Sequence, residues 1–124
     1  MKPITSAMHG ILDYAAAAFL VLAPSLFNLD GTAALTFYLL AAIEFVLALL
    51  TAFPSGVLKV IPVRVHGGID LVTAFVIAAL PWLLGISQQS TARNLLLAVA
   101  LLVLVIWFMT QWHDDARRVS IRPS

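Results

Sequence analysis

The sequence predicts an all-α membrane protein with four transmembrane helices, arranged as two repeated helical hairpins with both termini on the cytoplasmic side. Three observations predict this fold class. The 124-residue chain is 62% hydrophobic and only 10% charged, whereas soluble domains carry about 25% charged residues. Four apolar stretches each approach the ~20 residues that a helix needs to cross a bilayer. The pattern His-Gly-x-x-Asp occurs twice, at residues 9–13 and 66–70.

The four predicted spans are runs of apolar residues separated by polar or proline-containing breaks. They cover residues 7–27, 32–53, 65–86 and 94–112. No segment alternates between apolar and polar residues, and backbone groups in lipid must bond within the protein. Helices are therefore expected in place of strands.

Local signals mark the ends of the first two helices. The hydroxyl group of Thr5 or Ser6 can cap the start of the first helix. Pro24 is expected in its last turn, where a proline kinks or ends a helix. The second helix is expected to start at Thr32 and to end before Pro54.

Similar signals mark the third and fourth helices. Pro62 suits the start of the third helix, and Pro81 is expected in its last turn. Thr91 lies at the expected start of the fourth helix. The apolar segment 57–63 is too short to span a bilayer and is expected to rest on the inner membrane surface.

The repeated pattern indicates internal symmetry. The two histidines that open the pattern are 57 positions apart (66 − 9), and at the same offset Pro24 matches Pro81. We therefore expect a single membrane domain, 1–124, built from a first repeat at about 4–53 and a second at about 61–112. Because each repeat holds two spans, the symmetry axis is expected to lie along the membrane normal.

Basic residues predict the orientation. Six of the seven lysines and arginines fall on the side of the N-terminus, and Arg93 falls on the other. By the positive-inside bias, both termini are cytoplasmic.

Each His-Gly-x-x-Asp pattern is followed by a proline eleven residues after its aspartate. This arrangement, repeated over four spans, resembles the bacterial and archaeal membrane proteins with SPW repeats, which are named for a Ser-Pro-Trp tripeptide at the proline turn. Here the tripeptide reads Ala-Pro-Ser at 23–25 and Leu-Pro-Trp at 80–82, so neither copy keeps it in full. The resemblance implies a four-span fold in the cytoplasmic membrane of a bacterium or archaeon, and it implies no reaction.

The histidine and the aspartate of each pattern are the first candidates for a site. His9 and Asp13 are four residues apart, as are His66 and Asp70, so each pair lies on one helix face. The leading interpretation is a structural network between helices. The alternatives are haem or metal binding through His9 and His66, and a proton or ion path. No cofactor and no metal is predicted.

Glu44 is the other candidate. It lies thirteen positions into its predicted helix, near mid-membrane or slightly inward, where a lone acid must face the bundle, an oligomer interface or water. The offset of 57 pairs it with Leu101, so the acid is not duplicated. It is interpreted either as a protonated acid bonded to a neighbouring helix or as a proton-coupled site, by analogy with small four-span exporters that carry one membrane acid.

No nucleophile triad, phosphate-binding loop or HExxH motif occurs, so no catalytic residue is predicted and an enzyme is not expected. We expect a small structural or accessory protein of the inner membrane. The alternatives are a proton-linked transporter or channel subunit that uses Glu44, and a haem or metal protein. The expected partners are the lipid bilayer and either a second copy or another membrane protein. Nucleic acid is not expected, because the chain has no basic patch.

The orientation can be tested by cysteine labelling, because the chain contains no cysteine. An impermeant thiol reagent applied to intact cells should label Gln88→Cys and leave Lys59→Cys unlabelled. Both variants should react after the cells are permeabilised. Labelling of position 59 alone in intact cells would mean that the topology is inverted.

Overall fold

The computed structural model describes residues 2–112, and these form four helices. The helices are α1 (Ser6–Leu26), α2 (Gly31–Leu50), α3 (Val63–Leu83) and α4 (Ser90–Met109). All four are long and apolar enough to cross a membrane, and no strand occurs within the described residues. The all-α, four-helix prediction is confirmed at this level.

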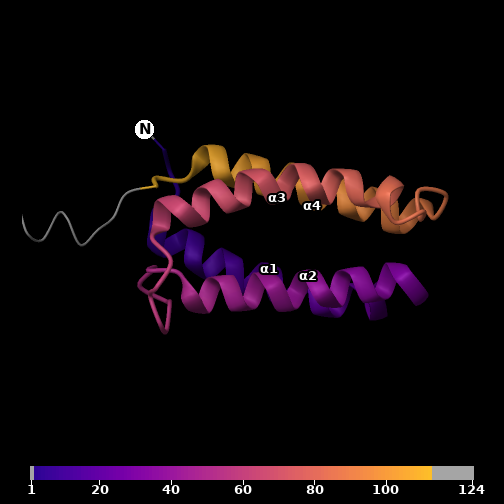
Figure 1. Ribbon diagram of the computed structural model, residues 1–124, viewed down its shortest axis with the longest axis horizontal. Helices are drawn as coiled ribbons and strands as arrows, with labels where there is room; N and C mark the ends of the chain where they lie inside the picture. Colours follow the sequence, from indigo (N-terminus) through magenta and orange to yellow (C-terminus); the bar gives the residue numbers. More distant parts are fainter. Residues whose placement is uncertain (1, 113–124) are drawn as a thin grey trace, which may run out of the picture.

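The four helices pack as two pairs. α1 lies along α2, and α3 lies along α4, as Figure 1 shows. The N-terminal segment and the connection between α2 and α3 lie at the same end of the molecule. We call α1 and α2 the first helix pair, and α3 and α4 the second helix pair.

The predicted helix signals agree with the structure. The Thr5 side chain accepts a hydrogen bond of 3.2 Å from the backbone N–H of Met8 and so caps α1. Pro24 and Pro81 each lie two residues before the end of their helices, in the last turn. α4 begins at Ser90, four residues earlier than the apolar run, because its first turn is built from polar residues.

α2 and α4 end before the predicted limits of 53 and 112, because the chain leaves each helix to pair with another segment. Thr51 forms an isolated bridge with Ile61, just before α3, and Thr110 forms one with Ile4, just before α1. Backbone hydrogen bonds of 2.8–3.1 Å support these pairings. The end of α2 is thus tied to the start of α3, and the end of α4 to the start of α1.

An apolar core joins the two helix pairs at the opposite end. Its members are small or branched residues, and one phenylalanine, that are almost fully buried. They are Leu20, Ala23, Ala33, Phe37, Ala41, Ile77, Ile86, Ala92, Leu96 and Ala100.

Two glycines allow aromatic rings to approach the helix starts. A Cβ atom at Gly67 would lie 2.9 Å from the ring of Trp112, and one at Gly10 would lie 2.5 Å from Oγ of Ser55 and 3.0 Å from Phe53. A Cβ atom at Gly68 would meet nothing within 4 Å. The glycine that follows each histidine therefore makes room for a ring that packs beside it.

This contrast gives a matched pair of variants. Alanine in place of a helical glycine gains about 1 kcal/mol of helix propensity, so Gly68→Ala should raise the melting temperature. Gly67→Ala should lose that gain or reverse it, because the Trp112 ring must move. Thermal unfolding followed by circular dichroism in detergent measures the difference. Equal melting temperatures would contradict the packing at Gly67.

Candidate functional site

The two His/Asp pairs meet in a single cluster between α1 and α3. Nε2 of His9 lies 3.2 Å from a carboxylate oxygen of Asp13 and 3.0 Å from one of Asp70. Nε2 of His66 lies 3.1 Å from Asp13 and 3.2 Å from Asp70. Each histidine thus contacts both aspartates. We call these four residues the His/Asp cluster.

The other ring nitrogens contact two threonines. Nδ1 of His9 lies 2.9 Å from Oγ1 of Thr110, and Nδ1 of His66 lies 2.7 Å from Oγ1 of Thr51. Each threonine hydroxyl donates its single proton to the backbone carbonyl group four residues earlier, at 2.6 Å. The hydroxyl oxygen can then only accept from the ring. Each imidazole therefore carries its proton on Nδ1.

The Nε2 atoms face only carboxylate oxygens, which can only accept hydrogen bonds when ionised. With Nδ1 also protonated, both rings are imidazolium ions. The cluster then holds two positive and two negative charges and is neutral as a whole. Neutrality matters, because an unbalanced charge away from water costs several kcal/mol.

The cluster is buried. Its four side chains belong to residues that are at most 7% exposed. Phe53 and Trp112 pack against the rings, with centroids 4.9 Å from His66 and 4.6 Å from His9, respectively.

Hydrogen bonding within the cluster is incomplete. Of the four Nε2–carboxylate contacts, the one between His9 and Asp70 has hydrogen-bond geometry. Nε2 of His66 and Oδ2 of Asp13 are buried and have no hydrogen-bond partner. The contacts of His66 are therefore close ion pairs whose direction is not that of a hydrogen bond.

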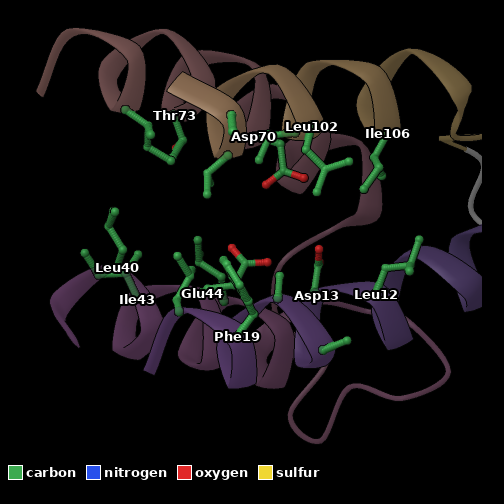
Figure 2. Close-up of a pocket in the computed structure, with 18 of the residues that line it drawn as sticks. Leu12, Asp13, Phe19, Leu40, Ile43, Glu44, Asp70, Thr73, Leu102 and Ile106 are labelled. Carbon is green, nitrogen blue, oxygen red and sulfur yellow. The ribbon is translucent and has the colours of Figure 1, made fainter. Parts of the chain in front are cut away.

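A cavity of about 410 Å³ lies beside the cluster, between the two helix pairs. Figure 2 shows side chains entering it from both pairs. The walls are apolar apart from His9, Asp13, Glu44, Asp70 and Thr73. Most of the lining comes from leucine, isoleucine, valine, alanine and phenylalanine of all four helices.

Glu44 belongs to this cavity. It lies six residues before the end of α2, or about 9 Å along the helix axis. Asp13 lies seven residues after the start of α1, at about 10 Å and thus at similar depth. Figure 2 shows the carboxyl groups of Glu44 and Asp70 pointing into the cavity from opposite helix pairs. Within residues 2–112, Glu44 forms no salt bridge, and its carboxyl group interacts with that of Asp13, by charge repulsion and by a side-chain hydrogen bond.

The threonines and the aromatic rings of this site were not among the residues predicted from the sequence. Their signal is a second repeated pattern, Thr-x-aromatic, at 51–53 and 110–112. Its offset is 59 (110 − 51), and the starts of α2 and α4 are separated by the same 59 (90 − 31). At that offset Glu44 corresponds in position to Val103 and not to the expected Leu101, because the connection before α4 is two residues longer than the one before α2. The acid is still not duplicated.

Comparison of the chain with family models, with curated proteins and with solved structures found no match. The resemblance to the SPW-repeat proteins stays a prediction.

The cluster predicts how its aspartates contribute to stability. Asp13→Leu leaves two buried imidazolium ions with one carboxylate, and breaking a buried pair in this way costs about 3–5 kcal/mol. Asp13→Asn keeps a hydrogen-bond acceptor and should cost less. Asp70→Leu and Asp70→Asn should behave alike, since both aspartates contact both histidines. Melting of the detergent-solubilised protein measures these costs, and unchanged melting temperatures would contradict a structural role.

Proposed function

We propose that this protein is a small, proton-linked carrier or channel component of the membrane, which binds lipophilic cations in the cavity between the helix pairs. The observation that carries the proposal is the position of Glu44. Its carboxyl group points into an apolar cavity and has no cationic partner within residues 2–112.

The charged groups that line the cavity explain why we expect its ligand to be a cation. The two imidazolium ions of the His/Asp cluster are already balanced by its two carboxylates, so they do not neutralise Glu44. The other titratable groups that line the cavity are His9, Asp13 and Asp70, all within the cluster. An ionised Glu44 would be an unmatched charge at low dielectric, which is costly. Either a proton or a bound cation removes that cost, and the two compete for the same carboxyl group.

The cavity matches this kind of ligand. Its volume of about 410 Å³ lies in the range of small-molecule sites. Its walls are mainly apolar, and the one ionisable lining group outside the His/Asp cluster is an acid, Glu44. A molecule with a hydrophobic body and one positive charge complements both features.

We further propose that the four helices span the cytoplasmic membrane of a bacterium or archaeon with both termini inside. The helix pairs would be two copies of one hairpin, related by a twofold axis along the membrane normal. Paired features support the repeat: two bridges, two His–Thr contacts and two aromatic rings beside the histidines. The basic residues counted beyond residue 112 lie outside the described residues.

The structural or accessory role that led the sequence analysis stays a prediction. The cluster can hold the helix pairs together, whereas the cavity beside it favours a ligand. A second copy or another membrane protein as partner also stays a prediction. Haem is not proposed, because each Nε2 already faces two carboxylates within 3.2 Å.

Binding of tetraphenylphosphonium, a lipophilic cation, tests the proposal. The purified protein in detergent should bind it more tightly as the pH rises, because protons compete for Glu44. Glu44→Gln should abolish binding and its pH dependence. Asp30→Asn removes an acid at the start of α2, outside the cavity, and should leave binding unchanged. Equilibrium dialysis with the radiolabelled cation measures this.

Transport gives a second readout. In proteoliposomes, a gradient of the cation should drive a proton flux that Glu44→Gln removes. Undiminished flux or binding in Glu44→Gln would overturn the proposed role of this residue.

A further inference from the structure

We propose that the His/Asp cluster is a binding site for one divalent transition-metal ion, with zinc as the best fit. The ligands would be Nε2 of His9 and of His66 and one oxygen each of Asp13 and Asp70. Glu44 lies beside this site and interacts with Asp13, but the inference does not depend on cation binding in the cavity.

The distances between the candidate ligand atoms support a central ion. One atom from each of the four residues can be chosen so that all lie within 4.8 Å of one another. The four Nε2–oxygen contacts are 3.0–3.2 Å long and use both oxygens of each aspartate. In a tetrahedral zinc site with bonds of about 2.0 Å, neighbouring ligand atoms are about 3.3 Å apart.

The chemistry of the ligand set points to the same class of ion. Imidazole nitrogen and carboxylate oxygen together suit zinc and its neighbours in the first transition row, whereas magnesium and calcium prefer oxygen alone. Each of the two helices α1 and α3 supplies one histidine and one aspartate. The two residues are four positions apart, so both lie on the same face of their helix.

The threonines supply the outer support that metal-binding histidines need. A ligating histidine almost always donates its other N–H to a fixed acceptor, which sets the tautomer and the ring orientation. Here Nδ1 of His9 donates to Thr110 and Nδ1 of His66 donates to Thr51, at 2.9 and 2.7 Å. The nitrogen left to face the cluster is Nε2 in both rings.

The unsatisfied atoms are an independent observation. Nε2 of His66 and Oδ2 of Asp13 are buried within the cluster and have no hydrogen-bond partner. A buried polar atom without a partner is costly. These two atoms lie 3.1 Å from each other without hydrogen-bond geometry, and an ion at the centre would satisfy both at once.

Metal binding would also leave the net charge of the cluster unchanged. When a dication binds, the two Nε2 protons leave, so two imidazolium ions become two neutral imidazoles beside one ion of charge two. The cluster stays neutral in both states. Zinc therefore replaces two protons without placing a net charge in a buried region.

The test is zinc binding to the full chain, purified in detergent with an affinity tag that contains no histidine. After treatment with a chelator, equilibrium dialysis with metal analysis should give one zinc ion per chain. His66→Gln and Asp70→Asn should lose this stoichiometric binding. Asp30→Asn removes an acid that is not in the cluster, and it should retain zinc binding.

A second pair of variants tests whether the hydroxyl group of Thr51 supports the ring of His66 for metal binding. Loss of such a partner typically weakens metal affinity by about 10–100-fold, so Thr51→Val should bind zinc more weakly by this factor. Thr51→Ser keeps the hydroxyl group and should bind as the parent protein does. Both substitutions keep all four ligands, so the comparison holds even if the ligand variants fail to fold.

Cobalt(II) in place of zinc tests the coordination geometry through its visible absorption spectrum. The cobalt-loaded protein should show the intense visible bands of a tetrahedral ion, and His66→Gln should remove them. The proposal is overturned if the parent protein binds no zinc, if folded His66→Gln still binds one ion per chain, or if Thr51→Val and Thr51→Ser bind equally well.

Discussion

The structure depends on the neutrality of a buried ion cluster that joins its two halves. α1 packs against α2 and α3 against α4, while contacts between the pairs concentrate at the His/Asp cluster and at the apolar core of the opposite end. The cluster contributes two contacts that cross between α1 and α3, from His9 to Asp70 and from His66 to Asp13. Because the charges of the cluster sum to zero, its ion pairs can hold α1 and α3 together without the full free-energy cost of burying a lone ion.

The surroundings of the cluster preserve that balance. The threonine hydroxyls set the proton on each Nδ1, and the rings of Phe53 and Trp112 pack against the histidines. The aromatic residues can reach the histidines because a glycine follows each histidine. The chain segments that carry these residues are held by the bridges at Thr51 and Thr110. Backbone pairing, ring packing and ion pairing thus support one another at this end of the molecule.

Two separate chemistries follow from the arrangement. Glu44 lies beside the cluster, interacts with Asp13 and has no cationic partner within residues 2–112, and we propose that it matches a cation in the apolar cavity. The cluster has a different property: its ligand atoms converge, and its neutrality survives exchange of two protons for one dication. The cavity is unsymmetrical, because Glu44 lines it from α2 whereas Val103 lines it from α4.

The sequence by itself determined the helical class, the number of helices and the positions of their proline-containing ends, because these depend on local hydropathy and backbone chemistry. It also identified His9, Asp13, His66, Asp70 and Glu44 as candidates, since an ionisable residue in an apolar run is conspicuous. Only the tertiary structure decided that the four cluster residues meet, that Thr51 and Thr110 support the histidines, and that Glu44 faces a cavity. The physical reason is that these contacts join residues 15 to 101 positions apart, and their geometry depends on how the helix pairs pack. The offset of 57 hid the threonines, because the connection before α4 is two residues longer and shifts every later counterpart to 59.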